Sequence, residues 1–195
     1  MARGDVALSV LMTTASTVAA AVMTPALAAL LAGQFIPVDA WGLAESTVRL
    51  VLAPTLAGVA LNELFPKAVA KVRPFMPLLA LLLTVVLCAV PVAHVAEVLK
   101  AVGGTAFWPV VGLHGFGYFL GYGLPRALGF TERVSRTVSI ETGMQSAAMG
   151  YALSTKHFAD VMVAVPSSVS IVVMVWMGAG LAAVWRTMPI KEEEN

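Results

Sequence analysis

A carboxylate lies inside an apolar run that is long enough to cross a bilayer. The run SIETGMQSAAMGYALST (residues 139–155) holds Glu141, then Gly143 two positions later and Gln145 two positions after that. A charge at mid-membrane costs roughly 2.5–3.5 kcal/mol on insertion scales, and a glycine weakens a helix. The pattern predicts a helix that breaks near Gly143 and presents a carboxylate, an amide and backbone carbonyls. Hard cations take oxygen ligands of these kinds, and broken membrane helices coordinate Na⁺ in this way.

Glu141 is also compatible with a structural or an enzymatic role. The side chain could be neutral and hydrogen-bonded to a neighbouring helix, or it could lie close enough to the interface to reach water. An intramembrane enzyme would need Glu141 and His114 to meet as acid, base or metal ligands. They lie in different predicted spans and no second carboxylate joins them at depth, so we expect a protein that is not an enzyme.

A second set of oxygens lies in the first apolar run, GDVALSVLMTTAS (residues 4–16). Ser9 and Thr13 are four positions apart, so they fall on one face of a helix. Hydroxyls at such positions can bind a cation, or they can serve helix packing, which small polar residues favour in membranes. The run ADVMVAVPSSVS (residues 159–170) has a similar order of residues. This weak similarity is typical of the internal repeats of transporters.

Composition restricts the class of protein. Of the 195 residues, 59% are hydrophobic and 12% are charged, and the formal net charge is +1. Soluble domains carry about 25% charged residues, so the sequence predicts an integral membrane protein with no basic surface for nucleic acid. The one cysteine, Cys88, excludes an internal disulfide. It lies in an apolar run and is expected to be a small core side chain.

Charges and prolines divide the chain into six predicted membrane spans, each close to the ~20 residues that a bilayer needs. They are residues 6–32, 46–65, 74–95, 105–125, 133–155 and 161–185. Six spans place both termini on one side. Of the 12 basic residues, nine (Arg3, Lys67, Lys71, Arg73, Arg126, Arg133, Arg136, Arg186 and Lys191) fall on that side and three (Arg49, Lys100 and Lys156) on the other. Cytoplasmic loops favour Lys and Arg, so we expect the termini to face the cytosol, or the stroma of a plastid.

Several motifs together resemble a known family. ARGDVALSVLMTTAST, MTPAL, IETGMQS and KHFADVMVAVPSSVS are similar in order and spacing to the bile acid:sodium symporter family. The plastid branch, which includes sodium-dependent pyruvate carriers of chloroplast envelopes, is the most similar. The resemblance implies an all-α transmembrane bundle with inverted repeats. The family fold has ten helices, and this chain resembles the last six, so we expect it to be part of a longer protein whose start is not Met1. It implies a core-domain helix (residues 1–32), panel-type helices (44–95), a core three-helix repeat with a broken helix (105–186) and a solvated tail (187–195).

The resemblance also implies which individual residues of this chain bind ligands. One family sodium site corresponds to Ser9, Thr13 and Glu141, and the second corresponds to Glu141, Thr142, Met144 and Gln145. Thr142 and Met144 would contribute backbone carbonyls. Ser146, just past the break, is a weaker candidate for contact with substrate. The remaining family ligands come from helices that have no counterpart here.

The expected function is sodium-coupled symport of a small organic anion, with a pyruvate-like carboxylate as the suspected substrate, Na⁺ as the co-transported ion and no organic cofactor. The expected partners are the lipid bilayer and this anion, and nucleic acid is not expected. The membrane is expected to be a plastid envelope, with a bacterial-type plasma membrane as the alternative. The alternative function is a truncated, non-transporting membrane fragment or accessory subunit. Because part of each ligand set has no counterpart, residues 1–195 alone are expected neither to bind Na⁺ at millimolar concentration nor to transport.

Overall fold

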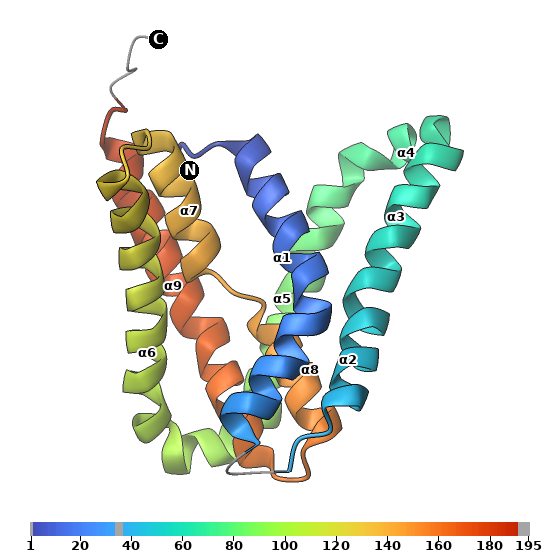
Figure 1. Cartoon of the computed structure of the whole chain (residues 1–195), viewed down its shortest axis with the longest axis vertical. Coiled ribbons are helices and arrows are strands. Elements are labelled where there is room, and N and C mark those ends of the chain that lie inside the picture. Colours follow the sequence, from blue (N-terminus) through green and yellow to red (C-terminus); the bar gives the residue numbers. More distant parts are fainter. Residues whose placement is uncertain (1, 34–36, 191–195) are drawn as a thin grey trace.

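The computed structural model describes residues 2–33 and 37–190, and within these ranges the chain is helical, with no strand (Figure 1). In chain order the elements are α1 (Val6–Leu27), η1 (Ala28–Ala32), α2 (Ala40–Thr47), η2 (Val48–Leu52), α3 (Ala53–Leu64), α4 (Pro66–Val72), η3 (Arg73–Phe75), α5 (Met76–His94), α6 (Ala96–Ala127), α7 (Glu132–Gly143), α8 (Ala147–His157), η4 (Val161–Ala164) and α9 (Val165–Thr187). The predicted all-α fold is confirmed.

Four helical units are long and apolar enough to cross a membrane: Val6–Ala32, Ala40–Leu64, Pro66–His94 and Val161–Thr187. They match the first, second, third and sixth predicted spans. The fourth predicted span lies within α6, which is longer than expected because its helix starts at Ala96, directly after α5. The segments 67–73 and 97–104, which lie between predicted spans, are also helical. The fifth predicted span is divided between α7 and α8, as the break near Gly143 requires.

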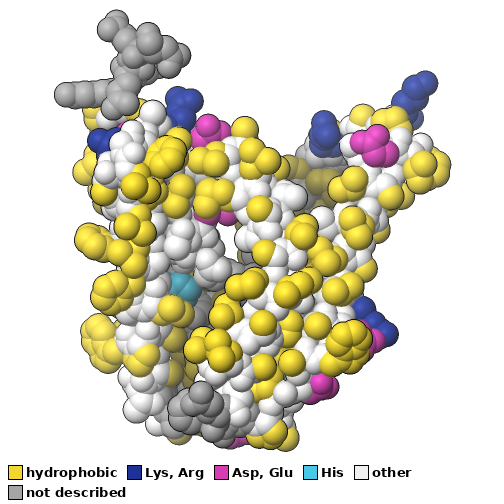
Figure 2. All heavy atoms as spheres, viewed as in Figure 1, with side chains coloured by type: hydrophobic (Ala, Val, Ile, Leu, Met, Phe, Trp, Pro, Cys, Tyr) yellow, Lys and Arg dark blue, Asp and Glu magenta, His cyan; other side chains and the backbone are white. Residues whose placement is uncertain are grey.

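The helices form two groups with α1 between them (Figure 1). Helices α6, α7 and α9 lie together on one side, while α2 and α3 lean away on the other. Helix α1 begins and α9 ends at the same end of the molecule, as the six-span prediction requires. Basic side chains are conspicuous at that end in Figure 2. Lys191 and the rest of 191–195, part of the predicted solvated tail, lie outside the described residues.

The two similar sequence runs begin their helices in the same way. The Asp5 side chain accepts a hydrogen bond from the backbone amide of Leu8 at 3.0 Å, and the Asp160 side chain accepts one from that of Met162 at 2.8 Å. A carboxylate at this position satisfies amides that have no partner within the helix. The two helices run in opposite directions, since α1 begins at the end where α9 finishes (Figure 1). Similar caps on antiparallel helices fit an inverted repeat.

Polar and apolar side chains are distributed opposite to their arrangement in a soluble protein. Apolar side chains cover α1, α3 and α5, and most of them are exposed (Figure 2). Helix α7 is the polar one, and its Ser135, Arg136 and Ser139 are almost completely buried. The exposed apolar surface suits contact with lipid chains, and the buried polar face of α7 needs hydrogen-bond partners inside the protein.

Arg136 is the largest of these buried polar groups. Its Nε donates to Glu132 at 2.7 Å and its Nη1 donates to the carbonyl of Trp185 at 3.0 Å, while the guanidinium lies 5.6 Å from the Trp185 ring centroid. Glu132 also accepts a hydrogen bond from the Tyr122 hydroxyl at 2.8 Å. The sequence pattern presented Arg136 simply as one basic charge on the cytosolic side. Instead it ties α7 to α9, and through Glu132 to α6, because a buried charge must be paired.

Replacing Arg136 by Met tests this network. We expect the free energy of unfolding to fall by about 3 kcal/mol, the lower end for removing one partner of a buried ion pair. Arg133→Met is the matched control, because Arg133 lies on the same helix and is exposed, so it should change stability by less than about 0.5 kcal/mol. Thermal unfolding of the detergent-solubilised protein measures both. Equal melting temperatures for the two variants would contradict this role of Arg136.

Candidate functional site

Glu141 lies where two helices that are distant in sequence meet. Ser9 and Thr13, one turn apart on α1, both donate hydrogen bonds to its carboxylate: Ser9 Oγ to Oε1, and Thr13 Oγ1 to Oε2 at 3.0 Å. The carboxylate therefore has a hydroxyl on each oxygen. Each hydroxyl still has lone pairs after donating its proton. The three residues expected for one cation site are thus brought together as a cluster of four side-chain oxygens.

The second expected set surrounds the interruption between α7 and α8. Helix α7 ends at Gly143, Met144 has extended backbone with φ −95° and ψ 118°, and α8 starts at Ala147. The Gln145 side chain turns back and donates its amide to the carbonyls of Thr142 (2.8 Å) and Glu141 (3.2 Å). One amide thus covers two carbonyls that the helix leaves without partners. Of the two carbonyls expected as cation ligands, those of Thr142 and Met144, the first is thus hydrogen-bonded to Gln145.

Helix α6 is fitted closely to the end of α7. A Cβ added at Gly121 would lie 2.9 Å from the Ser139 Cα, and one added at Gly117 would lie 3.1 Å from the Thr142 carbonyl oxygen. The Ser139 hydroxyl donates to the Tyr118 carbonyl at 2.7 Å. Glycines allow membrane helices to approach closely, and the helix that Gly117 and Gly121 admit here is the broken one.

Gly143 is required by packing as well as by helix weakening. A Cβ there would overlap the ring of Tyr118. Tyr118 is 6% exposed, and its hydroxyl donates to the carbonyl of Met174 on α9 at 2.8 Å. Tyr118 therefore holds the end of α7 against α9. The sequence patterns did not single it out; the signal that could have found it is a tyrosine in a membrane span, whose hydroxyl needs a partner.

His114 of α6 also contacts the break. It is 3% exposed, and its Nδ1 lies 2.8 Å from the carbonyl oxygen of Gly143. A carbonyl only accepts, so Nδ1 carries the proton and donates it. An enzymatic role would have paired His114 with Glu141. In the structure the hydrogen-bond partner of His114 is instead the last carbonyl of α7, that of Gly143.

A cavity of about 930 Å³ opens beside these groups. Its lining includes Thr13, Glu141, Gln145 and Ser146, together with Ser167 and Ser170 from α9. Glu141 is the one ionisable carboxylate among the lining residues described, and no Lys or Arg is among them. Across the described residues, no three His, Cys, Asp or Glu side chains cluster as they would around a transition metal. The oxygens present suit a hard monovalent cation.

Ser146 occupies the start of α8, at the wall of this cavity. It is the N-cap residue and makes no side-chain capping bond, and its carbonyl accepts from the amides of Met149 and Gly150, each at 3.1 Å. The N-terminus of a half-helix favours negative charge. Ser146, the weaker candidate for contact with substrate, is exposed. It lines the same cavity as Glu141 and Gln145.

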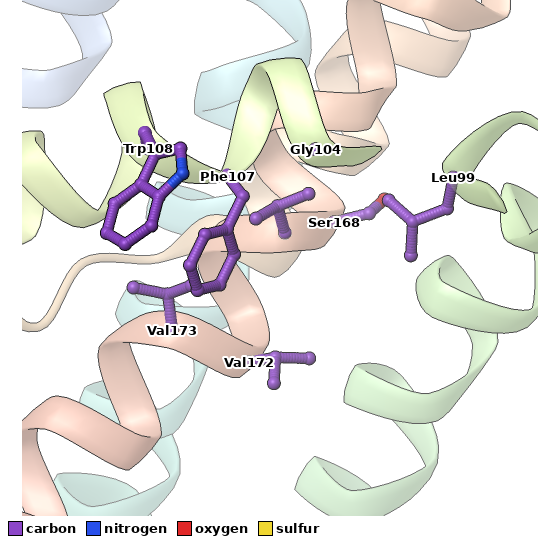
Figure 3. Close-up of a pocket in the computed structure, with 8 residues that line it drawn as sticks. Leu99, Gly104, Phe107, Trp108, Ser168, Val172 and Val173 are labelled. Atoms are coloured by element: carbon purple, nitrogen blue, oxygen red, sulfur yellow. The ribbon is translucent and has the colours of Figure 1, made fainter. Parts of the chain in front are cut away.

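A second pocket, of about 350 Å³, lies between the start of α6 and α9 and has a different character (Figure 3). Phe107, Trp108 and Val172 are among its lining residues, and Ser168 is the one polar side chain among those described there. The Ser168 hydroxyl donates to the Ala164 carbonyl at 3.1 Å. Because this pocket offers neither charge nor a free polar group, it is suited to an apolar chain and not to an ion or an organic anion.

The fit around the break predicts a contrast between two glycines of α9. A Cβ at Gly178 would lie 2.6 Å from the Tyr118 hydroxyl and 3.1 Å from the Met144 sulfur, whereas one at Gly180 has nothing within 4 Å. Gly178→Ala should lower the free energy of unfolding by about 1–3 kcal/mol, as overpacking does. Gly180→Ala should leave it unchanged or raise it by up to about 1 kcal/mol through helix propensity. Melting temperatures of the two purified variants measure the difference, and a Gly178→Ala protein as stable as Gly180→Ala would refute the close fit.

Known proteins are similar to this chain along its whole length. The model of the Sodium Bile acid symporter family matches residues 1–102. The chain is 51% identical over 197 residues to the probable sodium/metabolite cotransporter BASS2, chloroplastic, of Oryza sativa subsp. japonica, with 100% of this chain and 47% of the rice protein aligned. It is 45% identical to the probable sodium/metabolite cotransporter BASS1, chloroplastic, of Arabidopsis thaliana, with 100% of this chain and 49% of that protein aligned.

A third relative, the probable sodium/metabolite cotransporter BASS6, chloroplastic, of Arabidopsis thaliana, is 40% identical over 96% of this chain and 46% of its own length. The chain therefore spans about half the length of the curated relatives it matches. These relatives are named as cotransporters and not as enzymes, in agreement with the expectation from the sequence. Because the family model covers residues 1–102 of the 195, and because the all-helical fold with a broken span agrees with the family resemblance, the chain belongs to the sodium bile acid symporter family.

Proposed function

We propose that this chain supplies cation-binding and substrate-facing helices of a transporter that couples Na⁺ to the movement of a small organic anion. The observation that carries the proposal is the meeting of Glu141 with Ser9 and Thr13 beside a helix break and a cavity. Na⁺ would bind at two positions. The first uses Ser9, Thr13 and Glu141, and the second uses Glu141 with the backbone of Thr142 and Met144 and the amide oxygen of Gln145.

The charges of the cavity explain why an anion would need the cation. Glu141 is an acid in a cavity whose described lining includes no Lys or Arg, so a carboxylate substrate entering alone would meet like charge. Bound Na⁺ would neutralise Glu141 and draw the carbonyls of the break inward. The anion would then meet Ser146 and the positive end of the α8 dipole. A tenfold sodium gradient supplies about 1.4 kcal/mol per ion, so two ions would concentrate the anion about a hundredfold.

The relatives are named as chloroplastic sodium/metabolite cotransporters, which supports a plastid membrane and a metabolite as the substrate. On the resemblance of the sequence motifs to the plastid branch of the family, we propose that the membrane is the plastid envelope and that the metabolite is a pyruvate-like carboxylate. The moving contacts would lie between the core and panel helices, where α2 packs against α1 and against α8. Between α8 and α2, Lys156 and His157 each approach the buried Ser46 hydroxyl to 2.8 Å.

Glu141→Gln tests the proposal in the full-length protein. The substitution keeps the size and hydrogen-bonding capacity of the side chain but removes the charge that attracts Na⁺. We expect sodium-stimulated uptake of radiolabelled pyruvate into proteoliposomes to be lost, while the protein still folds, because the neutral side chain is easier to insert. Unchanged sodium stimulation in this variant would return Glu141 to a purely structural role.

A pair of neighbouring threonines refines that test. Thr13 bonds to Glu141, whereas Thr14 donates to the Val10 carbonyl of its own helix at 2.7 Å. Thr13→Ala should raise the sodium concentration for half-maximal uptake by about tenfold, the factor for 1.4 kcal/mol. Thr14→Ala, made as the control, should leave this concentration within about twofold, since an exposed intrahelical hydroxyl contributes little. The same sodium dependence in both variants would show that Thr13 is not a ligand of the cation.

A further inference from the structure

The end of α7 leaves three carbonyls without partners inside the helix, and two kinds of donor take them. Gln145 covers the carbonyls of Glu141 and Thr142, and His114 covers the carbonyl of Gly143. The two donors differ in accessibility, although both are among the residues that line the cavity. Gln145 is exposed, whereas His114 is 3% exposed and Gly143 is buried. The bond from Gln145 is therefore the more open to exchange with a cation or water.

The other ring nitrogen of His114, Nε2, is buried and has no hydrogen-bond partner among the described residues. An unpaired buried acceptor costs free energy that an apolar side chain at this position would avoid. The histidine is therefore explained by the bond at Nδ1. His114 lies one helical turn before Tyr118, whose ring packs against Gly143. Helix α6 therefore contacts Gly143 twice, through the polar contact of His114 and the apolar contact of Tyr118.

We propose that His114 is the positioning residue of the helix break, which sets sodium affinity by keeping the Gly143 carbonyl turned toward α6. This inference rests on the proposed sodium site. With the Gly143 carbonyl held, release of Gln145 frees the carbonyls of Glu141 and Thr142 alone, in a fixed orientation beside the carboxylate. Without that bond the last turn of α7 has a third free carbonyl and more conformational freedom. Each Na⁺ that binds would then have to order this turn, and the entropy cost would weaken its affinity.

Three substitutions of His114 separate the two ring positions. Asparagine places its amide nitrogen close to where Nδ1 lies, glutamine places its amide nitrogen close to where Nε2 lies, and leucine has no donor. In the full-length protein in proteoliposomes, His114→Leu and His114→Gln should raise the sodium concentration for half-maximal uptake by about tenfold. His114→Asn should stay within about twofold of wild type. The substrate KM at saturating sodium should change little in all three, because His114 acts on the cation site.

Hydrogen–deuterium exchange gives a readout that does not depend on coupling. In sodium-free buffer, exchange across residues 144–147 should be faster in the leucine and glutamine variants than in wild type and in the asparagine variant. If uptake by the wild-type protein does not depend on sodium, the proposed function is wrong. The hydrogen–deuterium exchange rates of the variants would still decide the role of His114. Three equally impaired variants, three unimpaired variants, or rescue by glutamine and not by asparagine would each overturn the proposal.

Discussion

The interruption of a helix at membrane depth is the constraint on which this structure depends. Lipid offers no hydrogen bonds, so every backbone group that α7 and α8 leave unpaired must find a partner in the protein or in a wet cavity, at a cost of several kcal/mol when it does not. Two side chains and a cavity meet this demand. The Gln145 amide covers two carbonyls and His114 covers a third. Met144, Gln145 and Ser146 are exposed and line the cavity.

These partners fall into a permanent set and an exchangeable set. His114 and Tyr118 are buried on α6 and fix the position of Gly143. Gln145 and Thr13 lie at the cavity wall and bond to oxygens that a cation could also bind. On the proposed function, such a site could bind and release an ion without unfolding the break. The cation would replace the hydrogen bonds that Thr13 and Gln145 donate, with the oxygens of both side chains as ligands, and the permanent contacts would keep the geometry between binding events.

Much of the site could be predicted because its signals are local in sequence. Glu141, Gly143 and Gln145 lie within five positions, and an acid in an apolar run is costly enough to be informative. The role of α6 was less accessible. Its Gly117 and Gly121 indicated a close helix crossing but not the helix that crosses. Arg136 looked like one more basic residue at a span end, because its burial depends on Trp185, which is 49 positions away.

The joint between α1 and α7 shows how cation binding and helix packing are linked. The membrane-spanning window of α1 has 0% of its residues buried, so apolar packing contributes little to holding it against α7. Polar groups make the hydrogen bonds between the two helices: the Asp5 amide donates to the Thr137 hydroxyl at 2.7 Å, and Ser9 and Thr13 donate to Glu141. A cation between these hydroxyls and the carboxylate would join the two helices directly. On the proposed function, Na⁺ would therefore act as a removable cross-link in the joint, so its arrival and departure would change how firmly α1 is held to the broken helix.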